Sequence, residues 1–308
     1  MVRGGFLGKN STNNLVILAL KAFVLMTLGV YFPVIYFFVP ALFITESLKS
    51  GIVKVMAVFL IICCAILYFA GVYSAVSCLL LLGPFILLFN YLIITDRSVD
   101  FTIILTAVLF FISMVVVAYF LGITSTTLKS QEMINRFIET QGELIKQMGT
   151  NMEVSNSALV AMYNRGLQLI PSVMLLCSLI MSYLTYTVTG RNLLREKKVI
   201  KQPSSFIFFR LPSGFLLSGL IGVVLIYLFQ DYFWSSYKVI LENIIVVYSA
   251  LLFFQGLSFI KFMLIRARVN RFVQFLIIVA ALMFPEFQIV LVILGIADVI
   301  VNFRQIPK

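Results

Sequence analysis

Long apolar runs, separated by short polar or basic segments, recur along almost the whole chain. Such runs reach about 18 or more residues, the length that an α-helix needs to cross about 30 Å of hydrocarbon. Alternating strand patterns are absent, and continuous apolar runs do not fit the wall of a β-barrel. The pattern therefore predicts an all-α, polytopic integral membrane helical bundle. Its six clearest spans are residues 52–69, 73–94, 101–122, 167–188, 211–230 and 241–260.

Both ends of the chain carry apolar stretches that are too long for one straight span. Residues 15–45 contain Pro33 and Pro40, and residues 272–303 are interrupted at Pro285. A straight helix of either length would reach about 48 Å, well beyond the bilayer. Proline removes a backbone donor and crowds the preceding turn, so we expect broken helices at both ends. The expected total is about eight to ten transmembrane segments, with ten favoured.

The charges give these spans an expected orientation. The chain is 62% hydrophobic and 11% charged, with a formal net charge of +11. Its basic residues gather in two loops, 189–210 and 261–271, and loops of this kind usually face the cytoplasm. We therefore expect a multi-pass protein of the cell membrane with both termini cytoplasmic. The same loops would meet anionic lipid headgroups, and nucleic acid is not an expected partner.

The chain reads as a single membrane domain, residues 1–308, with three parts. These parts are an N-terminal bundle (15–122), an amphipathic helical segment expected outside the cytoplasm (123–166), and C-terminal spans with basic cytoplasmic loops (167–308). The middle segment could pack on its own bundle, which is the favoured interpretation, or lie on the membrane surface, cap a cavity or bind a partner helix. Its apolar stripe consists of Ile134, Phe137, Ile138, Leu144, Ile145, Met148 and Met152.

The sequence lacks the residue patterns that most catalytic sites and metal sites need. It contains no histidine, which is the commonest general base and the commonest metal ligand. The four cysteines lie in apolar spans without metal-ligand spacing, and no carboxylate pair stands out at membrane depth. We therefore expect no catalytic site, no metal, no cofactor and no enzymatic activity.

Polar side chains within the spans are the candidate binding residues. Lys21, Asn90 and Gln255 lie in apolar runs, where polar groups are costly and often functional. Alternatively, Lys21 can extend to the interface, and the two amides can make interhelical hydrogen bonds. Tyr31 and Tyr36 lie in the proline-broken stretch, where aromatic rings would give a cavity flat apolar walls with polar tips.

Asp298 is the other polar residue that needs a partner, because it sits inside the last apolar run. Arg304 follows six residues later, too far round one continuous helix for a comfortable pair. A base from another segment is therefore favoured, in a charge pair that would fix the last helix to the bundle. The candidates for this charge pair are Arg304, Arg210, Arg266, Arg268 and Arg271.

The segment around Asp298 also carries a family resemblance. "LGIADVIVNFR", residues 294–304, resembles the C-terminal signature of the bacterial DUF2232 family, also called the YybS-like membrane proteins; "FRLP", residues 209–212, is similar too. Where relatives often have an acid shortly before Phe-Arg, this chain has Asn302. The resemblance implies a membrane protein with no particular activity, and the N-terminal half is similar in layout to S components of energy-coupling-factor transporters. The matching positions are Arg210, Pro212, Gly295, Asp298, Phe303 and Arg304.

Two functions follow from these observations. The first is a membrane protein that binds or transports a small solute, in the manner of an S component. The alternative is a scaffold or regulator without transport, which would bind partner membrane proteins or anionic lipids. The first predicts a cavity lined by Lys21, Asn90 or Gln255, whereas the second predicts that these groups are satisfied internally.

Overall fold

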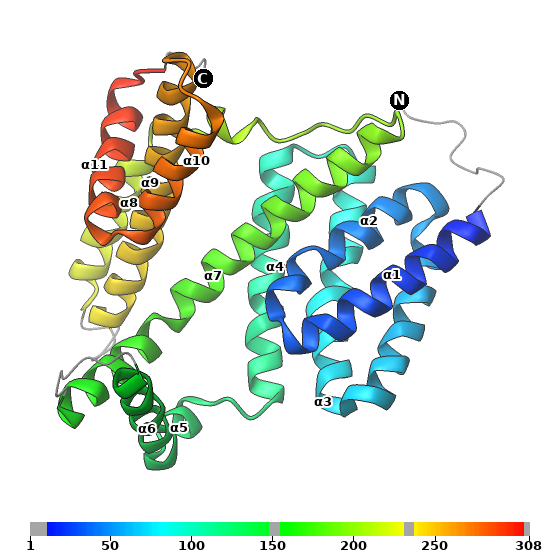
Figure 1. Ribbon diagram of the computed structural model, residues 1–308, viewed down its shortest axis with the longest axis horizontal. Coiled ribbons are helices and arrows are strands. Elements are labelled where there is room, and N and C mark those ends of the chain that lie inside the picture. Colours follow the sequence, from blue (N-terminus) through cyan, green and yellow to red (C-terminus); the bar gives the residue numbers. More distant parts are fainter. Residues whose placement is uncertain (1–10, 148–154, 231–236, 305–308) are drawn as a thin grey trace. The chain divides into compact units, whose positions relative to one another are not determined.

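The computed structural model describes residues 11–147, 155–230 and 237–304, which form helices joined by short loops (Figure 1). No strand occurs within these ranges. Among the described residues, five helices are long and apolar enough to cross a bilayer, and a bent helix pair near the C-terminus can supply a sixth span. The predicted all-α membrane bundle is confirmed, whereas the total of eight to ten segments stays a prediction.

The chain folds as two compact units, and one long helix, α7 (Asn156–Arg195), contributes to both. The N-terminal unit contains the residues up to Val160 together with Cys177–Pro203, and the remainder of the chain forms the C-terminal unit. The last half of α7 belongs to the N-terminal unit because its side chains pack there: the ring of Tyr186 lies 5.7 Å from that of Phe89.

The first apolar stretch is broken, as predicted from its prolines. It forms α1 (Ser11–Tyr31), the 3₁₀ turn η1 (Pro33–Phe37) and α2 (Val39–Ser50). The break falls at Phe32, which leaves helical geometry with φ −127° and ψ 85°. Pro40 lies in the first turn of α2, where its missing N–H would have no partner within the helix.

Two predicted spans, 52–69 and 73–94, form one 43-residue helical element, α3 (Ile52–Ile94), with a break between them. Gly71 has φ 82° and ψ 172°, a conformation that only glycine adopts easily, and α3 there divides into two arms (Figure 1). The next helix, α4 (Val99–Phe120), begins at Ser98, whose side chain accepts a hydrogen bond from the Phe101 N–H.

The N-terminal unit has two ends of different character. We name them the Gly71 end, which also carries the last residues of α1 and α4, and the Lys49 end, where α2 and α7 finish. Three segments at the Gly71 end, residues 22–38, 65–80 and 110–128, contain no charged residue. The Gly71 end is therefore an uncharged region of the protein.

Charged side chains gather at the Lys49 end instead. The Lys49 ammonium lies between two carboxylates, 3.6 Å from Glu46 and in contact with Glu196 at the end of α7. A second pair joins Lys201 to Asp96, with Nζ and Oδ2 2.8 Å apart. These pairs tie the end of α7 and the loop after it to α2 and to the α3–α4 turn.

The amphipathic segment forms α5 (Ser125–Leu128) and α6 (Gln131–Gln147). The helix predicted from its apolar stripe is thus confirmed, although Met148 and Met152 lie outside the described residues. No side chain described for α6 is fully buried, so packing of the stripe into the core of its own bundle is not observed.

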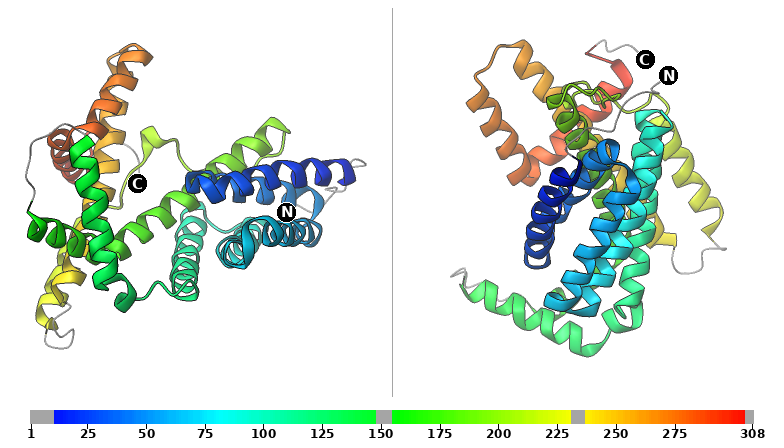
Figure 2. Two further views of the ribbon diagram at one scale, coloured as in Figure 1. Left: turned by 60° about the horizontal axis from the view of Figure 1, so that its bottom comes forward. Right: turned by 90° about the vertical axis from the view of Figure 1, so that its right-hand side faces the viewer.

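The C-terminal unit consists of η2 (Phe206–Phe208), α8 (Phe215–Leu228), α9 (Tyr237–Arg266), α10 (Arg271–Met283) and α11 (Pro285–Val301), together with residues 161–176 of α7. The last two helices meet at an angle of 103°, which confirms the predicted break beside a proline (Figure 2). Helix α11 packs along α9, and this helix pair holds the buried polar side chains of Gln255, Ser258 and Asp298.

Candidate functional site

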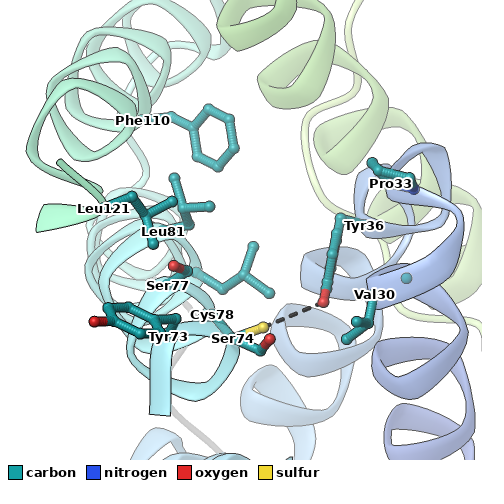
Figure 3. A pocket seen from close by; sticks show the side chains of 12 residues that line it. Val30, Pro33, Tyr36, Tyr73, Ser74, Ser77, Cys78, Leu81, Phe110 and Leu121 are labelled. Atoms are coloured by element: carbon teal, nitrogen blue, oxygen red, sulfur yellow. Dashed lines mark hydrogen bonds between the residues drawn. The ribbon is translucent and has the colours of Figure 1, made fainter. Parts of the chain in front are cut away.

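The Gly71 end of the N-terminal unit contains a cavity of about 280 Å³ (Figure 3). Its walls come from the end of α1, from η1, from the second arm of α3 and from α4. The volume is near the lower limit of small-molecule pockets, which span about 300–1,000 Å³. Among the lining residues are Tyr36, Tyr73, Ser74, Ser77, Cys78 and Phe110.

The break between α1 and α2 places Tyr36 in this wall. As part of η1, its ring folds back over Gly29 of α1, where an added Cβ would come within 2.9 Å of the ring. The Tyr36 hydroxyl donates to the Met26 carbonyl oxygen at 3.3 Å and lies 3.3 Å from the Cys78 thiol sulfur. The broken helix, the missing side chain at position 29 and these two contacts together fix the ring.

The cavity is mostly apolar and has no charged lining residue. Its polar groups are hydroxyls and one thiol; Ser74 and Ser77 are half-buried. Figure 3 shows Tyr36 on one side and Phe110 and Leu81 on the other. Aromatic and aliphatic walls with a few hydroxyls suit a small neutral molecule that carries one or two hydrogen-bonding groups.

Of the five predicted binding residues, only Tyr36 lines this cavity. Lys21 is exposed on α1, and Tyr31 is 76% exposed. Asn90 is buried, but its Oδ1 accepts a hydrogen bond from the Ser47 hydroxyl at 2.7 Å, between α3 and α2. Lys21 and Asn90 therefore do not line this cavity, because one side chain is exposed on α1 and the other joins two helices, and their predicted role in binding stays a prediction.

Gln255, the fifth residue, belongs to a buried polar network in the C-terminal unit. Its Oε1 accepts the Leu211 N–H at 3.0 Å, and its Nε2 donates to Asp298 Oδ2 at 2.6 Å. Its side chain is fully buried, so the internal hydrogen bonds replace those that water would make. Gln255 thus connects α9 with α11 and with Leu211, which lies just before α8.

Arg304 is the charge partner of Asp298. Its Nη2 and Nε lie 2.7 and 3.1 Å from Asp298 Oδ2, and both residues are at most 6% exposed. The favoured expectation of a base from another segment is wrong, because the helix does not continue to Arg304. It ends at Val301, and Asn302 takes a left-handed conformation (φ 53°) that turns the chain back. Of the other candidates, Arg266, Arg268 and Arg271 are exposed and Arg210 is half-buried.

The remaining donors of Arg304 are also used. Nη1 donates to the Ile207 carbonyl and to the Ser258 hydroxyl, both at 2.7 Å, and Nη2 donates to the Phe209 carbonyl at 2.8 Å. With the two bonds to Asp298, all five N–H groups of the guanidinium are satisfied. The Ser258 hydroxyl in turn donates to the Phe206 carbonyl at 2.6 Å. Arg304 therefore holds the segment 206–209 against α9 and α11.

Two glycines allow α9 and α11 to approach closely enough for this network. A Cβ on Gly256 would lie 1.9 Å from the Leu291 carbonyl oxygen, and one on Gly295 would lie 2.1 Å from that of Leu252. Both contacts are with backbone, which cannot move aside as a flexible side chain could. Small residues at such positions are typical of helix pairs in membranes.

Sequence reasoning found part of each site. Ser258 was missed, although it follows Gln255 by three residues and so shares its helix face. The apolar surroundings of Cys78 in the sequence predict only a small hydrophobic side chain, and nothing in the sequence pairs it with Tyr36. Among the described residues, no group of three or more His, Cys, Asp or Glu side chains could hold a metal ion.

Comparison with known proteins gives one family match. A family model described as "Predicted membrane protein (DUF2232)" matches residues 21–299, which is most of the chain. No curated protein and no solved structure matches the chain. The layout similarity to S components stays a prediction.

Proposed function

We propose that the N-terminal unit of this protein, which belongs to the DUF2232 family of predicted membrane proteins, binds a small neutral molecule in the cavity beside Tyr36. The observation that carries the proposal is an uncharged cavity of about 280 Å³, built by a broken helix and lined by aromatic rings and hydroxyls. Its size and lining favour a compact, largely apolar or aromatic solute with one or two polar groups. The role is binding without chemical change.

Transport would require more than this cavity. The residues that line it lie toward the Gly71 end, whereas charged side chains gather at the Lys49 end. A solute could cross only if the unit also opened toward the Lys49 end. We propose the cell membrane as the location, with the Lys49 end and both termini cytoplasmic, because the basic segment 189–210 lies at that end and basic loops usually face the cytoplasm.

A scaffold without a solute is the second candidate, and a specific observation favours it. Asn90 and Gln255, which the sequence suggested as binding groups, are both satisfied by internal hydrogen bonds. A scaffold of this kind would use its basic loops and α6 to bind partner membrane proteins or anionic lipids. It would need no ligand in the cavity.

A substitution that fills the cavity with a side chain distinguishes solute binding from the scaffold function. Leu81→Trp places a bulky ring in the cavity, whereas Leu87→Trp on the same helix adds it at a residue that is 46% exposed. Each purified protein is denatured, and the released small molecules are identified by mass spectrometry. We expect wild type and Leu87→Trp to release the same metabolite and Leu81→Trp to release much less.

Candidate metabolites are then added back, and thermal stabilisation is measured. Stabilisation of wild type and Leu87→Trp, but not of Leu81→Trp, supports the solute-binding function. If all three proteins release only lipid, and no compound in a metabolite screen raises the Tm of wild type, the solute-binding proposal is wrong. The scaffold function is then favoured.

A further inference from the structure

The corner between α9 and α10 concentrates positive charge on a well-defined turn. Arg266 ends α9, Arg271 begins α10, and Arg268 lies between them; all three side chains are exposed. Residues 261–285 contain no acidic residue, and none of the three arginines forms an ion pair with any described residue. The corner therefore presents three uncompensated guanidinium groups.

Backbone hydrogen bonds fix the shape of this corner. The Val269 N–H donates to the Leu264 carbonyl and the Arg268 N–H to the Ile265 carbonyl, which is the hydrogen-bond pattern that usually ends a helix at a glycine. The side chain of Asn270 then caps α10 by accepting from the Phe272 N–H at 3.1 Å. The three arginines thus stand on a defined turn rather than on a flexible loop.

Arg268 occupies the position in this turn that glycine normally takes. Its φ is 53°, in the left-handed region that an L side chain adopts at some energetic cost. Gly122 takes the same position at the end of α4, whereas Asp96 and Lys197 take it at the ends of α3 and α7. This position is therefore not restricted to glycine in this chain, and at Arg268 the turn holds an exposed guanidinium in a fixed place.

Apolar side chains follow the arginines directly. Phe272 is 67% exposed, Phe275 61% and Leu276 49%, all on the first two turns of α10. Guanidinium groups next to exposed aromatic and aliphatic side chains match a molecule with an anionic head and apolar chains. A phospholipid has this chemistry, whereas free phosphate would leave the apolar side chains uncovered.

We propose that the α9–α10 corner binds the headgroup of an anionic phospholipid through Arg266, Arg268 and Arg271, with the acyl chains against Phe272 and Phe275. This site is independent of the Tyr36 cavity, so either proposal can fail without the other. It also goes further than the general attraction of a basic loop to the membrane, since it assigns one fixed turn.

The test uses the full-length protein in a neutral detergent, with dioctanoyl phosphatidylglycerol as the probe. Arg268→Gly removes one guanidinium but supplies the residue that the backbone prefers, so the fold should be kept. Lys197→Gly is the matched control, because Lys197 also has a positive φ (62°), at the end of α7 in the other basic segment. Affinities come from titration, and the Tm without lipid checks the fold.

We expect Arg268→Gly to bind the lipid about fivefold more weakly, as loss of one arginine near a membrane surface would predict. Combining it with Arg266→Gln and Arg271→Gln should weaken binding about 100-fold, and Lys197→Gly should weaken it clearly less than Arg268→Gly does. Three results would overturn the proposal: equal binding by the triple variant, an equal loss in Lys197→Gly, or wild-type affinity for dioctanoyl phosphatidylcholine or inorganic phosphate that equals its affinity for the anionic lipid.

Discussion

Replacing Asp298 by asparagine tests whether the buried network stabilises the C-terminal unit. The change keeps the shape of the side chain but removes the charge that faces Arg304. Asp298 Oδ2 accepts one hydrogen bond from Gln255 and two from Arg304, at 2.6–3.1 Å, and the side chains of the ion pair are at most 2% exposed. The guanidinium would remain buried without a counter-charge, so we expect a loss of about 3 kcal/mol in the free energy of unfolding.

Asp96→Asn is the matched control for this variant. It makes the same chemical change in an ion pair with Lys201, but there the side chains are 76% and 57% exposed. Solvent screens that pair, so the expected cost is below about 1 kcal/mol. Unfolding of both variants is measured in the same detergent by temperature and by denaturant. A similar small loss in both would refute the reasoning and show that Asp298 is solvated in the protein.

A double variant separates the charge from the rest of the network. Arg304→Met alone should be costly, because it leaves the Asp298 carboxylate buried without its base. Combined with Asp298→Asn, it removes both charges at once. We expect the double variant to be less destabilised than the sum of the two single variants, by about 0.5–3 kcal/mol. Strict additivity would mean that the two side chains do not interact.

Two further predictions concern packing and topology. Gly256→Ala should destabilise the protein by about 1–3 kcal/mol, because the added Cβ would collide with the Leu291 carbonyl oxygen. Gly222→Ala is the control: an added Cβ there has no atom within 4 Å, so the variant should be neutral or slightly stabilised in the same thermal unfolding measurement. In a cysteine-free background, a membrane-impermeant maleimide added to intact cells should label Thr126→Cys but not Val199→Cys, and labelling of Val199→Cys would refute the proposed orientation.

Hydrophobic pattern and proline placement predicted the fold well, because both act through the local backbone. The breaks near Pro33 and Pro285 and the division of α3 between the two predicted spans were all visible in the sequence. The partner of Asp298 was not, since it depends on a single residue. A straight helix carries Arg304 away from Asp298, and only the left-handed Asn302 returns it.

The cavity shows the same limit of sequence reasoning. Tyr36 was predicted as a wall residue from the broken stretch, but its contact with Cys78 joins residues 42 positions apart. The sequence predicts binding groups from polar side chains within the apolar spans, but Asn90 and Gln255 make hydrogen bonds between helices. In a membrane protein, a polar residue that joins two helices by a hydrogen bond and one that contacts a ligand both appear in the sequence as a polar residue within an apolar run.

The two sites differ in how far their polar groups are already hydrogen-bonded inside the protein. Every N–H of Arg304 already has an acceptor inside the protein, so a ligand could bind the guanidinium only by displacing existing hydrogen bonds, although Asp298 Oδ1 is buried without a hydrogen-bond partner. In the cavity, Ser74 and Ser77 line open space, and the Tyr36 hydroxyl makes only long contacts of 3.3 Å. A neutral ligand could replace these weak contacts with shorter ones at little cost. These contacts support the proposal of ligand binding in the N-terminal unit, while the C-terminal network fixes the ends of its helices.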